Sequence, residues 1–204
     1  MRPLRNRKGI VGIEAAIVLI AFVVIAAAFS YVVINMGFFA TQKTKDVINE
    51  GIEESTGSMQ LDGTVIARTV SDDNITYIVL PVKLSVGKGT VDLGANSTVI
   101  TVYLPDATLL DIYEGVDIGQ KLLNQTMLDL VEADSAKSFI YNGNGNSVLE
   151  FQEKAFIILH LGLGNEMKSY QTVKIEVKPG RGAALTVVRT APGGMLANEF
   201  IDLG

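Results

Sequence analysis

One segment near the N-terminus limits what this chain can fold into more than any other feature. From Ala15 to Gln42 the sequence has 28 residues without a charged side chain, and most are Ala, Ile, Val or Phe. As an α-helix this segment would be about 42 Å long, which exceeds the ~30 Å hydrocarbon core of a bilayer. Apolar residues surround such a helix on every side, so it requires lipid or other helices around it.

A short basic stretch precedes the apolar segment. Its four cations, all before Gly9, are Arg2, Arg5, Arg7 and Lys8. Positive residues beside an apolar run stay in the cytoplasm, which places the rest of the chain outside the cell. Bulky residues at 36–40 disfavour an ordinary secretory cleavage site after the run. A plain single-pass membrane anchor therefore remains open on these features alone.

Two details where the basic stretch meets the apolar segment suggest more than a plain anchor. The charges stop at Lys8, Gly9 follows, and the apolar run begins at Ile10. Glu14 lies at the edge of this run, and a carboxylate at membrane depth costs roughly 2–3 kcal/mol. Glu14 either favours the positive end of the helix dipole or, if the chain is cut after Gly9, pairs with the new α-amino group of Ile10 on a neighbouring subunit. Such a cut leaves the helix on the mature protein.

Both ends of the chain resemble a known family. Arg7 to Phe22, with Tyr-Val-Val-Ile-Asn-Met-Gly at 31–37, closely resembles the precursors of archaeal flagellins (archaellins). Ile175 to Pro192, with a Lys-Pro-Gly turn and an Arg-Thr-x-Pro segment, is similar to the archaellin C-terminal signature. The resemblance implies a class III signal peptide cut between Gly9 and Ile10 by a membrane protease of the prepilin-peptidase type, which reads Lys8 and Gly9.

The same resemblance gives Glu14 a role, because it matches the acidic residue that follows the cleavage site in type IV pilins. Ile10 differs from the methylated phenylalanine with which bacterial pilins usually begin, so methylation is not implied.

The remainder of the chain predicts an α+β protein with a β-rich head. Helical spacing continues through Val47, Ile48 and Ile52 and is expected to end at Gly57, which predicts a leader at 1–9, a helix at 10–57 and a head at 58–204. Strands are expected at 75–86, 90–93, 98–104, 155–163, 172–178 and 184–189, with turns at 87–89 and 142–146. Residues 115–133 are either a short helix or irregular. Many short strands predict a sandwich or partly closed barrel, and the resemblance implies an immunoglobulin-like one.

Groups capable of catalysis or metal binding are sparse. The sequence has no cysteine and one histidine, His160, which is expected to be a satisfied or surface side chain. Asp72-Asp73-Asn74 offers oxygen ligands for a cation such as calcium, but a solvated turn fits it better. We predict no enzyme, no cofactor and no metal site. The balance of 22 acidic and 17 basic residues gives no reason to expect nucleic-acid binding.

Three sequons become relevant once the head is outside the cell. They begin at Asn74, Asn96 and Asn124, each with Thr two residues later. N-glycosylation is therefore predicted at these asparagines. The resemblance supports this, since archaellins are commonly glycosylated.

The leading functional hypothesis is a structural subunit of the archaeal flagellum (archaellum), used for swimming and in some cases adhesion. Mature subunits would leave the membrane and form a homo-polymeric helical filament with the apolar helices as its core. The contacts expected there involve Glu14, Ile17, Ile20, Val24 and Tyr31. Partners are the peptidase, the archaellum motor and assembly machinery and, transiently, the membrane. The alternatives are a non-rotating archaeal type IV adhesion pilus and a membrane-anchored extracellular enzyme or binding protein.

Overall fold

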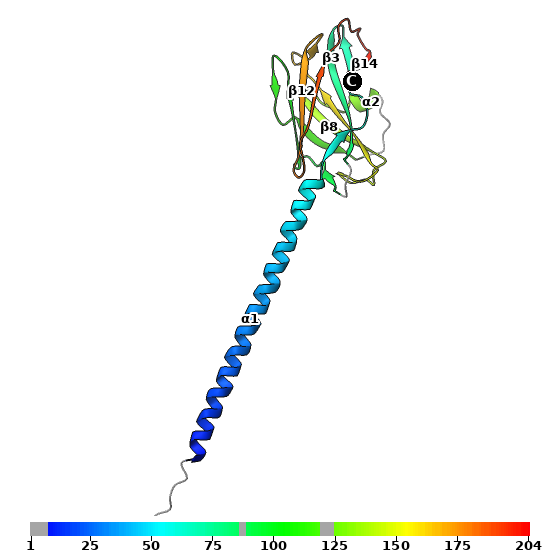
Figure 1. Cartoon of the computed structure of the whole chain (residues 1–204). Helices are drawn as coiled ribbons and strands as arrows, with labels where there is room; N and C mark the ends of the chain where they lie inside the picture. Colours follow the sequence, from blue (N-terminus) through cyan, green and yellow to red (C-terminus); the bar gives the residue numbers. More distant parts are fainter. Residues whose placement is uncertain (1–7, 86–88, 119–124) are drawn as a thin grey trace, which may run out of the picture. The chain divides into compact units, whose positions relative to one another are not determined.

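The computed structural model describes residues 8–85, 89–118 and 125–204, which form one long helix followed by a β-rich head (Figure 1). The chain divides into two compact units, residues 1–50 and 51–204. The head has its own hydrophobic core, so each unit can be described by itself.

The helix α1 runs from Lys8 to Thr56, so it begins two residues before and ends one residue before the predicted range of 10–57. Its sequence is rich in Ala, Ile and Val and contains no Pro; the alanines favour a helix, and Gly57 follows the last turn. The hydroxyl groups of Ser30, Thr41 and Thr44 donate hydrogen bonds to carbonyl oxygens four residues earlier. These polar side chains are thus satisfied without water, which makes them compatible with lipid. The predicted cut after Gly9 would fall in the first turn of this helix.

The head contains two main sheets. The larger has the order β14-β2-β3-β10-β8-β7, with β1 and β11 also paired to β3. Its strands are β1 (Met59–Leu61), β2 (Ile66–Ser71), β3 (Asn74–Leu84), β7 (Tyr113–Asp117), β8 (Ser135–Tyr141), β10 (Lys154–His160), β11 (Met167–Lys168) and β14 (Phe200–Asp202). All pairs are antiparallel except β7 with β8. The connection between these two parallel strands carries the short helix α2 (Gln125–Leu128).

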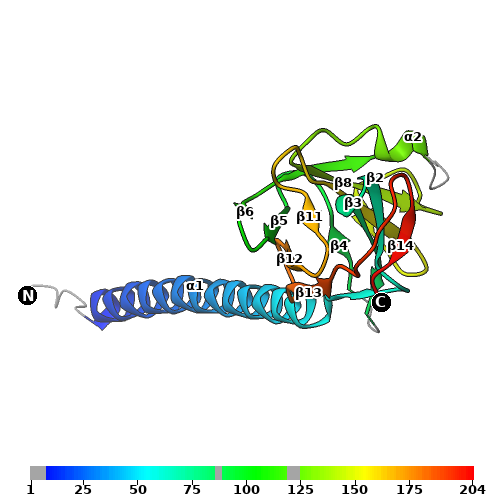
Figure 2. The same cartoon turned by 90° about the horizontal axis from the view of Figure 1, so that it is seen from above.

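The smaller sheet has the antiparallel order β13-β12-β5-β6. Its strands are β5 (Thr98–Tyr103), β6 (Thr108–Leu109), β12 (Thr172–Pro179) and β13 (Leu185–Thr190), and a separate ribbon pairs β4 (Val91–Asp92) with β9 (Val148–Leu149). The expected Lys-Pro-Gly turn therefore connects the hairpin of β12 and β13. Figure 2 shows the two sheets from a second direction.

The core lies between the two sheets, which makes the head a β-sandwich. Ile78 and Leu80 of β3 pack in one buried cluster with Ile100 of β5 and Ile175 of β12. Alternating apolar residues on these strands face inward, as the period-2 pattern of the sequence predicts. The expected α+β class and sandwich head are confirmed.

A second apolar cluster covers the outer face of the larger sheet. Met127 and Leu128 of α2, with Val131 behind it, pack against Tyr77 and Phe139. The sequence left 115–133 open between a short helix and irregular structure; its described part begins inside strand β7 and includes the short helix α2. The period-2 pattern also missed strands β1, β2, β6, β8, β9, β11 and β14, and the expected turn at 87–89 lies largely outside the described residues.

Candidate functional site

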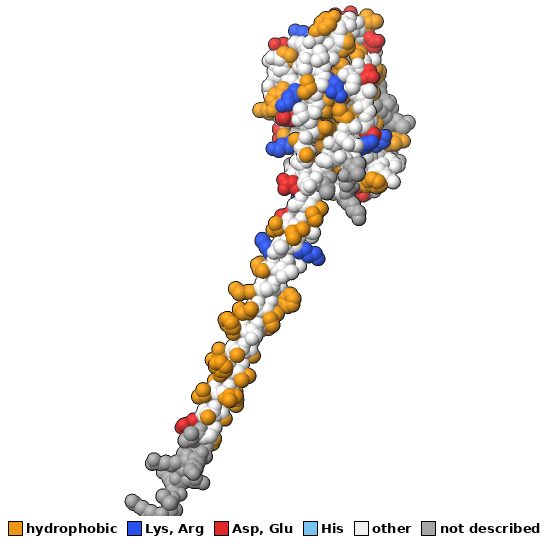
Figure 3. Space-filling view, viewed as in Figure 1, with side chains coloured by type: hydrophobic (Ala, Val, Ile, Leu, Met, Phe, Trp, Pro, Cys, Tyr) orange, Lys and Arg blue, Asp and Glu red, His pale blue; other side chains and the backbone are white. Residues whose placement is uncertain are grey.

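The outer surface of α1 is the first candidate site. The large apolar side chains of α1 at residues 13–39 are between 51% and 74% exposed. Figure 3 shows them along the helix. The segment Gly12–Ile52 is long and apolar enough to cross a membrane by length and composition. An exposed apolar surface of this extent requires a covering of lipid or protein.

Four predicted assembly residues lie on one face of α1. Ile17, Ile20, Val24 and Tyr31 follow intervals of three, four and seven residues, which keep side chains on one side of an α-helix. All four side chains are exposed. The helix therefore places these four side chains in one stripe that a second helix can contact.

Glu14 lies on the same side of the helix as this stripe, three residues before Ile17. Its carboxylate borders a shallow hollow formed with Ala15, Val18, Leu19 and Phe22. A small group from a neighbouring chain can enter this hollow and reach the carboxylate. Lys8, Gly9 and Ile10 lie in the first turn of α1.

The two described sequons differ in accessibility. Asn96 is exposed on the turn before β5. Asn74 is partly buried at the start of β3, and its side-chain amide donates to the Ser71 hydroxyl (3.3 Å). Its Thr76 is the extra residue of a β-bulge opposite β2 and is buried at 7% exposure. Asn124 lies outside the described residues. Asn96 is thus the more accessible acceptor.

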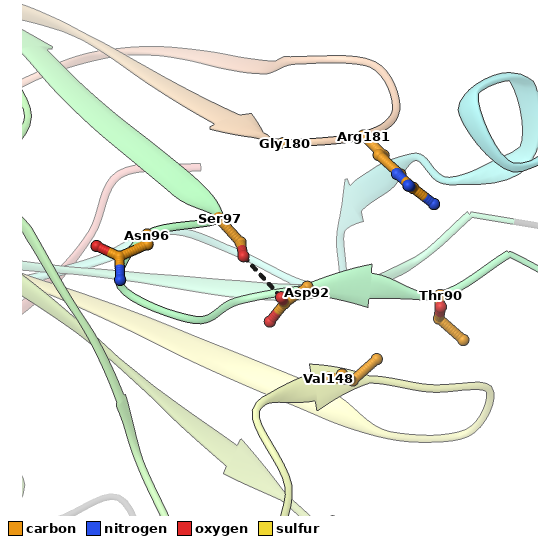
Figure 4. A pocket seen from close by; sticks show the side chains of 7 residues that line it. All are labelled: Thr90, Asp92, Asn96, Ser97, Val148, Gly180 and Arg181. Carbon is orange, nitrogen blue, oxygen red and sulfur yellow. Dashed lines mark hydrogen bonds between the residues drawn. The ribbon is translucent and has the colours of Figure 1, made fainter. Parts of the chain in front are cut away.

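A cavity of about 610 Å³ lies beside Asn96, between the β4–β5 turn and the β12–β13 hairpin (Figure 4). The Asp92 carboxylate borders it and accepts hydrogen bonds from the Ser97 hydroxyl (2.6 Å), the Gly94 amide (2.8 Å) and the Ser147 hydroxyl (3.2 Å). These donors, the Ser97 hydroxyl first, hold the pKa of Asp92 below its usual value. Asp92 therefore closes its own β4–β5 turn and joins it to the loop before β9; its Asp-x-Gly turn sequence was the available signal for the local part of this role.

The acidic turn at residues 72–74 has a structural role. The Asp73 carboxylate accepts from the Ser169 hydroxyl (2.7 Å) and the Met195 amide (3.2 Å). The Asp72 carboxylate accepts from the Ala197 amide (2.9 Å). The turn thus fastens the segment before β14 to the sandwich. This agrees with the sequence prediction, which favoured a turn at 72–74 rather than a calcium site.

His160 has a packing role in the second apolar cluster. Its ring stacks on Tyr77, with centroids 4.3 Å apart, and its Nδ1 lies 2.8 Å from the Val131 carbonyl oxygen. This satisfied environment is what the sequence predicts for the residue. Among the described residues no group of three or more His, Asp or Glu side chains could hold a metal ion.

Comparison with known proteins adds an independent finding. The sequence model for archaeal-type flagellin matches residues 9–189. A probable flagellin of Aeropyrum pernix is 40% identical over 98% of this chain and 100% of its own length. The archaeal flagellum of Methanospirillum hungatei has a chain that is 29% identical, with a TM-score of 0.64 over 93% of this chain and 99% of that one. An archaeal flagellin crystal structure from Methanocaldococcus jannaschii shares the fold, with a TM-score of 0.60 at 13% identity over 72% of this chain and 96% of its own.

Proposed function

This chain belongs to the archaeal-type flagellin family, structural subunits of the archaeal flagellum, and we propose that it reaches the filament as a membrane-anchored precursor that loses residues 1–9 before it polymerises through α1. The observation that carries this proposal is the exposed, charge-free helix from Ala15 to Gln42 on a chain similar over 93% of its length to a filament subunit.

The membrane stage follows from the properties of α1 and the leader. The four leader cations stay in the cytoplasm, the apolar helix spans the bilayer, and the head lies outside the cell. A prepilin-peptidase-type protease then cuts between Gly9 and Ile10 on the cytoplasmic side of the membrane. The mature subunit retains α1 and loses the cations that kept its N-terminus in the cytoplasm.

Polymerisation replaces lipid around α1 with sister helices. If each helix buries about 1,500 Å² of apolar area, then at ~25 cal/mol per Å² the gross gain is tens of kcal/mol before ordering costs. The stripe of Ile17, Ile20, Val24 and Tyr31 supplies part of this contact. Identical subunits joined head to tail without ring closure give an open helical polymer, extracellular and joined to the motor and assembly machinery of the archaellum.

Glu14 gives the polymer its register. Cleavage creates an α-amino group on Ile10, and the apolar surroundings strengthen its attraction to a neighbour's Glu14 carboxylate. The hollow beside Glu14 leaves room for this group. An uncleaved chain lacks the amino group at Ile10, so processing and assembly are coupled.

The exposed Asn96 is the preferred glycosylation site on the head. Its amide is accessible on a turn, whereas Asn74 is hydrogen-bonded and partly buried. The static adhesion pilus receives no support from the family match, and the Lys-Pro-Gly hairpin of β12 and β13 agrees with the flagellin signature.

The decisive experiment is mass analysis of the N-terminus of subunits sheared from cells. We expect a chain that starts at Ile10. An intact Met1, or a start after Asn35, contradicts the filament proposal. A Gly9→Val variant should keep the full-length chain in the membrane and abolish filaments, while Pro3→Ala, a leader change away from the cut, should leave both processing and filaments unchanged.

A further inference from the structure

The two ends of the head differ in chemistry, and strand register defines them. At one end lie the loops 71–74, 104–112, 129–135, 161–171 and 191–199, which we call the distal loops. At the other end lie 57–65, 89–98, 141–154 and 179–184, which we call the base. The base includes Ser58, where the chain enters the sandwich and bridges to Ala183.

The distal loops expose large apolar side chains on well-held turns. Leu163 is 96% exposed, yet its turn is fixed because the Asp134 carboxylate accepts from the Gly162 amide (2.8 Å) and the Asn165 side chain (3.0 Å). Tyr170 is 79% exposed and its amide donates to the Ala191 carbonyl. Leu110 and Leu196 are also mostly exposed. Ordered turns that hold leucines in water are typical of a surface that a partner covers.

The same loops are strongly acidic. They contain nine acidic residues and one lysine, Lys168: the acids are Asp72, Asp73, Asp106, Asp111, Asp129, Glu132, Asp134, Glu166 and Glu199. Like charges at this density repel a second distal surface, so symmetric distal-to-distal contact is disfavoured.

The base offers a different surface. Asp62 is paired there with Lys83 (2.6 Å) and with Lys154, and Lys178 and Arg181 lie at its edge. Counted over its four segments, the base has four acids and two cations, a net charge of −2, whereas the nine acids and one lysine of the distal loops give −8. A cavity of about 60 Å³ opens between Val116, Asp117, Ile118 and Ile140 and the 143–146 turn. Exposed Tyr141 and Phe151 flank this part of the base.

We propose that the distal loops of one head dock on the base of a second copy of this chain, with the Leu163 turn directed to the cavity beside Ile118 and Ile140. The inference rests on the filament function proposed above, because the polymer holds copies close together. Both surfaces expose large apolar side chains, and the charge repulsion between a distal surface (net −8) and a base (net −2) is much weaker than that between two distal surfaces. The contact is heterologous, so it extends from subunit to subunit without closing.

Cysteine cross-linking in filaments tests this contact, because the chain has no cysteine of its own. The test variant is Leu163→Cys/Ile118→Cys, treated with a short bis-maleimide. A cross-link within one head is excluded because β8, seven residues or about 23 Å long, separates the two ends. The matched control is Leu163→Cys/Val188→Cys, whose second cysteine lies on the exposed face of β13.

We expect a ladder of dimers, trimers and longer products from the test variant, at least fivefold stronger than from the control. The Leu163→Cys single variant should give no dimers. Three results with normal filaments would overturn the docking contact: no ladder, an equal ladder in the control, or dimers from the single variant. Each of them would leave the filament function intact. Failure of the cysteine-free parent to form filaments refutes the filament function itself.

Discussion

At the scale of single residues, several carboxylates in this protein connect parts of the structure. Asp73 and Asp134 hold loops through backbone amides, and Asp92 joins the β4–β5 turn to the loop before β9. Glu14 is the exception, because it lies on the exposed surface of an apolar helix. The ion pair proposed above gives this charge a partner from another subunit.

Replacing Glu14 tests that partner. Glu14→Gln should be inserted and cleaved normally but should form few or no filaments, because the neutral amide cannot attract the Ile10 α-amino group. Electron microscopy and the mass of the membrane-bound subunit measure both effects. Glu14→Asp, which keeps the charge, is the control and should retain partial assembly. Abundant filaments from Glu14→Gln would rule out the proposed ion pair.

The lowered pKa of Asp92 makes its contribution to stability depend on pH. The charged carboxylate stabilises the fold above the ordinary aspartate pKa of about 3.9, and this contribution is lost as the pH falls through the lower pKa of the folded state. Asp92→Asn should therefore cost about 0.5–1 kcal/mol of unfolding free energy at pH 7, discounted for exposure, and clearly less near pH 2. Denaturant unfolding at both pH values measures this.

A matched control for Asp92 is Asp111→Asn. Asp111 lies at an exposed turn and has a positive φ, a backbone angle that asparagine also tolerates. It should change stability little at either pH. A cost for Asp92→Asn that stays equal from pH 7 to pH 2 would contradict the role assigned to the charge.

At the scale of elements, α1 and the head are stabilised in different ways. The sandwich buries its apolar residues internally, whereas the apolar face of α1 has to be covered from outside the chain. The hairpin of β12 and β13 is held to the segment between α1 and β1 through a close backbone approach, next to the bridge between Ser58 and Ala183. A Cβ at Gly182 would lie 1.4 Å from the Gly57 carbonyl oxygen, and Gly182 has a φ of +101°.

Gly182→Ala tests this close approach. We expect the variant to lose about 1–3 kcal/mol of unfolding free energy, since both the backbone angle and the space exclude a side chain. Gly145→Ala is the control, because Gly145 also has a positive φ (+91°) but nothing lies within 4 Å of an added Cβ. It should lose clearly less in thermal or denaturant unfolding. Equal losses would mean that the contact with Gly57 is unimportant.

At the scale of the whole molecule, the chain combines a polymerising helix with a head that folds independently. Residues 51–204 form a compact unit with a continuous buried core. In the proposed assembly route the helix carries the drive for polymerisation, while the head forms the outer surface of the filament. On that proposal, the same chain is a membrane protein before assembly and an extracellular polymer afterwards.

Removal of residues 1–50 tests this division. The fragment 51–204 should be soluble without detergent, show β-type circular dichroism and sediment as a monomer at micromolar concentration, because isolated head contacts are weak without the helix. The full mature chain should need detergent or form filaments. Aggregation of the fragment, or filaments made from it, would show that the head depends on α1 or polymerises by itself.

By itself, the sequence determined the helix and the β character of the head. A charge-free run of 28 residues has few physical solutions, and alternating β-branched segments such as 98–104 and 172–178 favour strands through local preferences. The cut after Gly9 and the assembly role of Glu14 stay predictions.

Only the tertiary structure decided which strands pair, that 115–133 begins as the parallel strand β7, and that Asp73 fastens a segment 122 residues later in the sequence. It also decided that Asn96 is accessible while Asn74 is held, and that exposed leucines gather with acids at one end of the head. These features depend on contacts between distant segments. Local propensity and periodicity carry no information about such contacts, because the partners meet only after the two sheets have packed.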